Sequence, residues 1–244
     1  MSSPAKKYAI GWDVGGWNGT HNANSRDAIA ILDDDAKLVG RVWRGNLASA
    51  IHLAKNANEW LVSLFDLCDA PSTDNTVRAA IGIDTPLAFS AEFVSLLGGY
   101  AVESLGAASS QNQYLYRFTE RRLAAKGRTP LSPVKDMIGS QATKGMHALA
   151  RFTPVKKDVG VWADRSDYLL AFETYPTVCR DHPLVKRIVA NSPPQDNNDK
   201  QDALVCAAVA RLFLDDLSSL EQPLSEAPSA EGWIWRPIPD AAEL

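Results

Sequence analysis

The sequence predicts an α/β fold: a mixed sheet, antiparallel through its first three strands and then parallel, flanked by helices and carrying a helical insertion. Two observations lead to this class. Short apolar runs that end in a carboxylate or a turn are interspersed with longer segments of helical periodicity. The chain has 244 residues, 45% of them hydrophobic and 22% charged, which suits one globular domain over residues 1–244.

The first part of the chain predicts most of the sheet. Residues 8–13 form an apolar run that ends in an aspartate and a glycine turn, the pattern of a buried strand. Residues 26–32 and 38–43 lie on either side of an acidic turn and predict a β-hairpin. Residues 47–67 have the apolar spacing of a helix packed on a sheet, and residues 77–83 predict the next buried strand.

The middle of the chain, residues 88–160, predicts a helical insertion or lid within the domain. Residues 92–110 have a weak pattern and predict a loop with a short helix. Residues 114–126 predict a helix that ends at a glycine. A serine and a proline suit the start of a second helix over residues 132–152.

The last part of the chain returns to the sheet and its helices. Residues 168–172 predict a fifth strand, and residues 177–189 a helix. Residues 199–214 predict a strongly apolar helix with an acidic beginning, and residues 233–235 are a short apolar segment.

Bulk composition excludes some classes of function. A formal net charge of -4 counts against a protein that coats nucleic acid, although a local basic patch remains compatible with it. The three cysteines lie far apart without a CxxC pair, so we expect small core residues instead of disulfides or zinc ligands. No run approaches the ~20 apolar residues of a membrane span, and the start lacks a signal-peptide pattern, so we expect a cytoplasmic protein without membrane contact.

Five carboxylates share one kind of position. Asp13, Asp84 and Glu173 each come directly after a predicted strand, and Asp199 and Asp202 lie three apart at the start of the last helix. Ligand sites in open α/β sheets collect at the carboxyl ends of strands. Clustered carboxylates repel one another unless a cation neutralises them, and an all-oxygen site suits Mg²⁺ or Mn²⁺. The sequence therefore predicts a metal-type site.

Motifs along most of the chain also resemble a known family. From about residue 8 to residue 237 the sequence resembles the predicted-nuclease family called domain of unknown function 429, of the ribonuclease-H-like superfamily. The segments that carry the resemblance occur in the family's order: GWDVGG at 11–16, IGIDTPL at 81–87, FETYP at 172–176, DKQDAL at 199–204 and EGWIW at 231–235.

This resemblance implies a ribonuclease-H-like fold and assigns roles to the carboxylates. Asp13, Asp84 and Asp202 match superfamily positions that bind two magnesium ions, and Asp199 is a further metal ligand by the same match. Glu173 matches the family alone, and we expect Glu173 or Asp199 to complete the metal shell or orient water. The implied activity is metal-dependent phosphodiester hydrolysis with Asp13, Asp84, Glu173 and Asp202 as catalytic residues.

A basic stretch is the candidate for substrate contact. Arg117, Arg121 and Arg122 lie on the predicted helix of the insertion, followed by Lys126 and Arg128. Guanidinium groups bind phosphates through paired hydrogen bonds, so we expect Arg117, Arg121 and Arg122 to contact substrate phosphates. A solvated helix face is the alternative.

Two further readings remain open. One is a non-catalytic binding module that keeps the fold and uses the acidic cleft for a ligand. The other is a single-domain relative of the actin-like kinases, because the DVGG segment at 13–16 is similar to their phosphate loop. Nucleic acid is the partner that the nuclease hypothesis implies, and the oligomeric state stays open, with a homodimer as one option.

Overall fold

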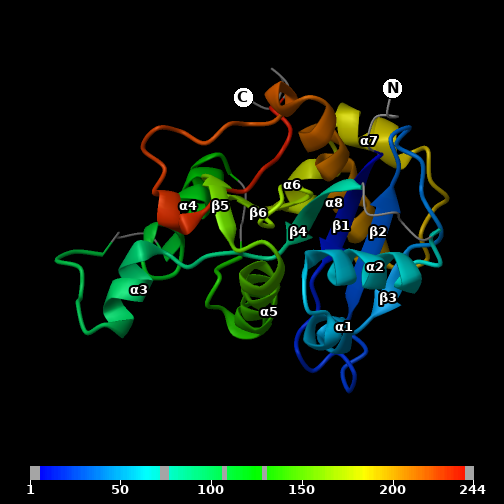
Figure 1. The fold of residues 1–244 in the computed structure, drawn as a ribbon. Coiled ribbons are helices and arrows are strands. Elements are labelled where there is room, and N and C mark those ends of the chain that lie inside the picture. Colours follow the sequence, from blue (N-terminus) through cyan, green and yellow to red (C-terminus); the bar gives the residue numbers. More distant parts are fainter. Residues whose placement is uncertain (1–5, 72–76, 106–108, 128–130, 240–244) are drawn as a thin grey trace.

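A seven-stranded mixed sheet forms the centre of the protein, as the computed structural model of residues 6–71, 77–105, 109–127 and 131–239 describes it (Figure 1). The strand order is β3-β2-β1-β4-β7-β6-β5. The strands are β1 (Lys7–Asp13), β2 (Asp27–Leu32), β3 (Trp43–Gly45), β4 (Arg78–Asp84), β5 (Val155–Asp158), β6 (Val161–Ala163) and β7 (Leu169–Glu173).

The pairing of the strands confirms the predicted mixed sheet. β1, β4 and β7 run parallel at the centre. β2 pairs antiparallel with β1, and β3 pairs antiparallel with β2, so the first three strands are antiparallel as predicted. On the other side β6 and β5 extend the sheet antiparallel to β7. The carboxyl ends of β1, β4 and β7 therefore lie side by side at one edge.

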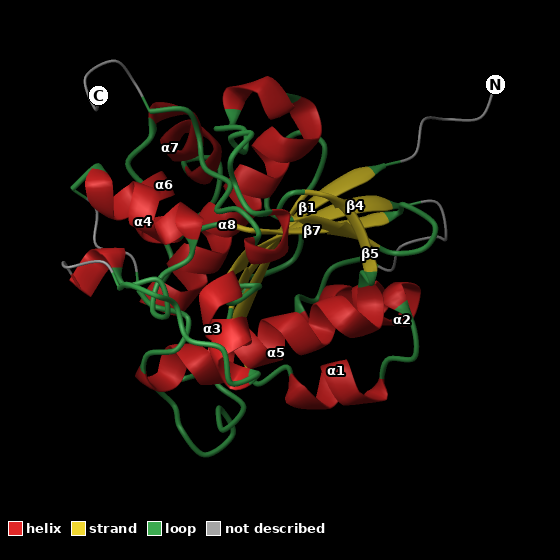
Figure 2. Ribbon diagram, turned by 90° about the vertical axis from the view of Figure 1, so that its left-hand side faces the viewer, coloured by secondary structure: helices red, strands yellow, loops and turns green. Residues whose placement is uncertain are grey.

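Helices cover both faces of the sheet (Figure 2). One face packs against α8 (Asn198–Asp215), with α6 (Pro176–Cys179) and α7 (Pro183–Val189) beside it. The other face packs against side chains of α1 (Ala48–Leu53), α2 (Ala57–Leu67) and α5 (Asp136–Phe152). Each face has its own apolar core, as expected for an α/β domain.

The remaining helices lie around the candidate insertion and the last part of the chain. They are α3 (Ala91–Leu97), α4 (Phe118–Ala125) and the short 3-10 helices Ser109–Gln111, Leu217–Ser219 and Ser229–Glu231. No helix in the described part of the chain combines the length and the apolar composition needed to cross a bilayer. The three cysteines are buried and free, which confirms their expected place in the core.

Two glycines let α8 approach the sheet very closely. A Cβ atom at Gly11 of β1 would lie 1.9 Å from the carbonyl oxygen of Ala203 in α8. A Cβ atom at Gly82 of β4 would lie 2.8 Å from the carbonyl oxygen of Cys206. Because both obstacles are backbone atoms, a side chain could fit only if the helix moved away. The two glycines thus determine how close α8 lies to β1 and β4.

Replacing Gly11 with alanine is therefore expected to lower the free energy of unfolding by about 3 kcal/mol, the upper range for overpacking. Urea denaturation would measure it. Gly139→Ala is the matched control, because a Cβ there meets its nearest atom at 3.7 Å and alanine favours a helix. Equal stability of the two variants would contradict the close backbone contact.

The structure corrects several predicted element boundaries. The helix expected over residues 47–67 is two helices, because the Asn56 side chain accepts the N–H of Glu59 and starts α2 anew. The helix expected over residues 177–189 is likewise divided before Pro183, the first residue of α7. The third strand is Trp43–Gly45, later and shorter than expected, and α5 begins at Asp136 instead of residue 132.

The candidate insertion is only partly separate from the core. α3 has no buried residue and extends away from the sheet (Figure 1). In contrast, α5 buries Ala148, Leu149 and Phe152 in the same core as Trp12 of β1. α5 is therefore a layer of the domain, and the assignment of residues 88–160 as an insertion or lid stays a prediction. The sequence also missed the β5–β6 hairpin within and beyond that range, because both strands are short and β5 is polar.

Candidate acidic site at the strand ends

Asp13 and Asp84 end two neighbouring parallel strands and lie directly beside each other. They are register partners in the β1–β4 pair, so their side chains leave the same face of the sheet. Gly11 and Gly82, two residues earlier on each strand, face α8. Because side chains alternate along a strand, Asp13 and Asp84 also point to the α8 face.

The start of α8 adds two more carboxylates. Asp199 and Asp202 lie in and just after its first turn, and Asn197 caps the helix by accepting the N–H of Asp199. Burial raises the pKa of Asp13 well above its ordinary value, and the negative charges of Asp84, Asp199 and Asp202 raise it further. The structure thus brings together four of the five carboxylates that the sequence singled out.

Two arginines neutralise the α8 side of this cluster. The guanidinium of Arg44 lies 2.6 Å from the carboxylate of Asp199, and that of Arg180 lies 2.9 Å from the carboxylate of Asp202. Burial raises the pKa of Asp202, and Arg180 counteracts this. Neither arginine was predicted, because the contacts join residues distant in sequence.

Asp13 and Asp84 themselves have no such partner. Within the described residues, neither side chain has a hydrogen bond or an ion pair. Burial raises the pKa of Asp84 well above its usual value; Asp202 and Glu173 add to the effect, and the charge of Arg180 acts against it. Two partly buried, adjacent carboxylates without a hydrogen-bond donor are costly to a fold, which makes this pair the candidate functional site.

A pocket of about 230 Å³ opens beside these two carboxylates. Its wall includes Asp13, Asp84 and Thr85, together with Gln141 of α5 and Tyr175. The hydroxyl of Thr85 is buried and has no hydrogen-bond partner. A buried polar group without a partner is rare in folded proteins, and this one belongs to a residue of the pocket wall.

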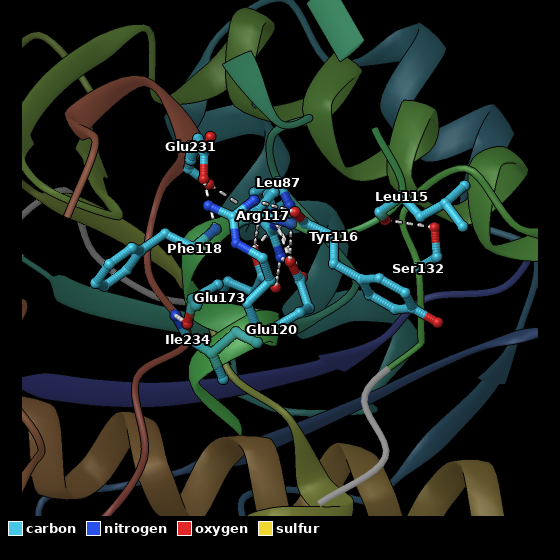
Figure 3. Close-up of polar contacts among 12 residues, drawn as sticks. Leu87, Leu115, Tyr116, Arg117, Phe118, Glu120, Ser132, Glu173, Glu231 and Ile234 are labelled. Atoms are coloured by element: carbon cyan, nitrogen blue, oxygen red, sulfur yellow. Dashed lines mark hydrogen bonds and ion pairs between the residues drawn. The ribbon is translucent and has the colours of Figure 1, made fainter. Parts of the chain in front are cut away.

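Glu173 occupies a different position from the four aspartates. Its register partner on β4 is Ile83, the residue before Asp84, so Glu173 points to the opposite face of the sheet. There it accepts two hydrogen bonds from Arg117, at 2.6 and 2.8 Å, and one from the N–H of Leu87 at 2.9 Å (Figure 3). Glu173 nevertheless lines the same pocket as Asp13 and Asp84, so its catalytic role stays a prediction, although its oxygens already accept these hydrogen bonds.

Arg117 is a structural residue in the interior. Its side chain is fully buried and also donates to Glu120 and to the carbonyl oxygen of Glu231 (Figure 3). Burial disfavours its charge, but Glu120 and Glu173 outweigh burial and raise the pKa of Arg117 above its ordinary value. The prediction that Arg117 contacts substrate phosphates is wrong, since solvent does not reach its guanidinium.

The other residues of the basic stretch are also engaged. Arg122 lies 2.8 Å from Glu221, and Lys126 lies 3.6 Å from the same carboxylate. Arg121 donates to the carbonyl oxygen of Tyr116. Arg128 lies outside the described residues. The stretch thus connects α4 to the last part of the chain, and its predicted role in phosphate binding has no geometric support here.

A second buried ion pair fixes the turn that follows Asp13. The ammonium group of Lys144, fully buried in α5, lies 2.5 Å from Asp27, which also accepts the N–H of Gly15 and the indole N–H of Trp12. Lys144 also donates to the carbonyl oxygen of Gly16. These bonds hold the glycine turn in place, and we infer that Lys144 and Asp27 position Asp13.

One observation counts against a metal ion at this site, and another favours it. In the residues that the structure describes, no three side chains of His, Cys, Asp or Glu are arranged to hold one ion. The donor chemistry nevertheless suits Mg²⁺, which is commonly held by one or two carboxylates while water and substrate phosphates fill the other positions. Asp13 and Asp84 supply such a pair, and the unpartnered hydroxyl of Thr85 lies at the same pocket.

A larger cavity lies at the other end of the strands. Its volume is about 590 Å³, and it is bordered by Val77 before β4 and Leu169 at the start of β7. Lys55, Arg151 and Arg165 line it with a single carboxylate, Asp164. It contains none of the predicted site residues, so size alone does not identify the functional site.

No protein-family description, no curated protein and no solved structure matches the chain. The geometry of the acidic site is therefore the basis for inferring a function.

Proposed function

We propose that the protein is a metal-dependent phosphodiester hydrolase with a ribonuclease-H-like fold. One observation carries the proposal: Asp13 and Asp84 end adjacent parallel strands, line one pocket and have no side-chain hydrogen bond or ion pair among the described residues. A Mg²⁺ or Mn²⁺ ion is the cofactor that such an arrangement favours.

The fold assignment is supported by the order of strands and carboxylates. The strand order β3-β2-β1-β4-β7 with an antiparallel β2, and with aspartates at the ends of β1 and β4, agrees with the resemblance of the sequence to the predicted-nuclease family. The acidic start of α8 beside them supports the same assignment.

Asp13 and Asp84 would hold the metal, and Asp202 and Asp199 would join them when Arg180 and Arg44 release their carboxylates. When bound, the metal supplies Lewis-acid stabilisation of a phosphodiester and activates water at neutral pH. The protein's own contribution is to fix the two carboxylates side by side at the ends of paired strands. Nucleic acid is the substrate class that follows from phosphodiester hydrolysis.

Metal binding is expected to raise the melting temperature. An ion that binds only the folded state stabilises it by about 2.7 kcal/mol at a concentration one hundred times its dissociation constant. Differential scanning fluorimetry with Mn²⁺, Mg²⁺ or EDTA measures this, and cleavage of labelled DNA and RNA is assayed in parallel. Glu226→Gln serves as a control that should respond to metal as the wild type does, because it removes an exposed carboxylate far from β1 along the chain.

The two assays separate the proposed function from its rivals. Stabilisation by metal together with cleavage supports the hydrolase. Stabilisation without cleavage of either nucleic acid favours a non-catalytic binding module. If millimolar metal leaves the melting temperature unchanged in both the wild type and Glu226→Gln, the proposed metal site is wrong.

A further inference from the structure

A basic hollow lies next to the acidic site. Asp199, which belongs to the carboxylate cluster, contacts Arg44 of the hollow. The volume of the hollow is about 330 Å³, and four cations line it with one carboxylate: Arg26, Arg41, Arg44, Lys200 and Asp196. The whole chain carries a formal net charge of -4, so this concentration of positive charge is local. The hollow brings together residues from the start of β2, the β2–β3 connection, β3 and α8.

The sheet places the hollow at a defined distance from the acidic site. Asp84, Asp13, Ala28 and Arg44 form one register row across four neighbouring strands. Their side chains therefore share the α8 face. Adjacent strands lie about 4.8 Å apart, so the backbone of Arg44 is about 10 Å from that of Asp13. A flexible polyanion lying across this row would meet the carboxylates and the cations in succession.

Three of the four cations of the hollow are available to a ligand. Arg26 has no hydrogen bond or ion pair within the described residues. Arg41 pairs with Asp69 at the surface, where both side chains are more than half exposed. Lys200 lies 2.9 Å from Asp196, a carboxylate that is 78% exposed. Exposed ion pairs contribute little stability, so an anionic ligand could replace these partners at low cost.

Arg44 connects the hollow to the acidic site. It donates to Asp199 at 2.6 Å and to the carbonyl oxygen of Ala23 at 2.6 Å. The pKa of Asp196 is held below its ordinary value, first by its bond to Lys200 and also by the charge of Arg44. Positive potential therefore extends from the hollow up to Asp199, which belongs to the carboxylate cluster.

We propose that the hollow formed by Arg26, Arg41, Arg44 and Lys200 binds the backbone phosphates that flank the phosphodiester bond held at Asp13 and Asp84. The proposal depends on the proposed function for the identity of that bond, while the anion site itself depends only on the hollow. It replaces the basic stretch of α4 as the substrate-contacting surface. The ligand class is a single-stranded phosphodiester chain, because a flexible strand can follow the register row.

The test is binding of a labelled single-stranded oligonucleotide, as DNA and as RNA, by fluorescence anisotropy in EDTA at several salt concentrations. The variant is Arg26→Ala/Arg41→Ala/Lys200→Ala, and Arg44 is left intact because it holds Asp199. The matched control is Lys37→Ala/Lys157→Ala/Lys186→Ala, which removes the same charge from three exposed lysines elsewhere. Arg26→Gln alone is a second variant, since it breaks no ion pair among the described residues.

The triple variant is expected to bind roughly tenfold more weakly than the control, and the slope of log K against log salt is expected to fall by about 2. Arg26→Gln should lower the slope by about 0.7, the value for one phosphate contact on a single strand. Equal loss of affinity in the triple variant and in the control would overturn the hollow as the binding site, as would no binding by the wild type.

Cleavage assays of the same proteins with Mn²⁺ separate this proposal from the proposed function. Binding that depends on the hollow without cleavage supports the anion site and overturns the hydrolase. Cleavage that is unaffected in the triple variant leaves the hydrolase in place and overturns the flanking-phosphate site.

Discussion

Replacing Asp13 with asparagine is expected to raise the melting temperature in EDTA while abolishing its response to metal and lowering nucleic acid cleavage at least about 10³-fold. In the metal-free protein Asp13 is a partly buried carboxylate beside Asp84, without a partner among the described residues. Removing an uncompensated buried charge stabilises a fold by about 1–3 kcal/mol. The loss of activity corresponds to the several kcal/mol that a bound metal contributes to the transition state.

The pH dependence of this variant follows from the raised pKa values of Asp13 and Asp84. A group whose pKa is higher in the folded state than in the unfolded state stabilises the fold at low pH, and this stabilisation is lost as pH rises through the folded-state pKa. The metal-free wild type should therefore lose stability relative to Asp13→Asn as pH rises. Metal binding and cleavage should increase over the same range, because only the deprotonated carboxylates bind a cation.

Asp33→Asn is the control for Asp13→Asn, because Asp33 lies in an exposed turn at the other end of β2. Melting curves in EDTA and in Mn²⁺, recorded across a pH series, compare the three proteins. A lower melting temperature for Asp13→Asn in EDTA at neutral pH would contradict the uncompensated carboxylate.

Replacing Arg117 with methionine is expected to lower the free energy of unfolding by about 3–5 kcal/mol, the cost of removing one partner from a buried ion pair. The variant leaves Glu120 and Glu173 buried without their cation. Against a typical total stability of about 5–15 kcal/mol, this is enough to unfold a substantial fraction of the protein at physiological temperature. Urea denaturation measures the change directly.

The defect of Arg117→Met should shrink as pH is lowered, because protonation neutralises Glu173. Burial already raises the pKa of Glu173 although Arg117 acts against it, and the pKa should rise further without the arginine. Arg122→Met is the matched control on the same helix, since its ion pair with Glu221 is partly exposed and worth about 1 kcal/mol or less. Equal destabilisation by both substitutions would show that Arg117 has no special structural role.

The sequence predicted the sheet and the aspartates well because local patterns determine both. The apolar runs before Asp13 and Asp84 are continuous, and a strand that ends in a carboxylate needs no distant information to recognise. That Asp13 and Asp84 lie side by side also follows from the parallel pairing of β1 and β4. The acidic start of α8 could be placed because the apolar segment after it is long. The catalytic role of these aspartates and the metal that they would bind stay predictions.

The features that the sequence did not predict share a different cause, which is long-range pairing. The alternation of side chains puts Glu173 on the far face of the sheet from Asp84, and this depends on the β4–β7 register. A run of arginines resembles a solvated phosphate-binding face until Arg117 is known to meet Glu173, 56 residues away. The basic hollow could not be predicted from the sequence either, because Arg26 and Lys200 come together only through the packing of α8 on the sheet.

The network around Arg117 also has a consequence for biosynthesis. A nascent chain contains Arg117 and Glu120 well before the ribosome adds Glu173, and later still Glu231, whose carboxylate accepts the N–H groups of Ala91 and Phe118. Until those residues emerge, α4 has no buried site to occupy. We therefore expect α4 to stay accessible to chaperones until the last segment has left the ribosome.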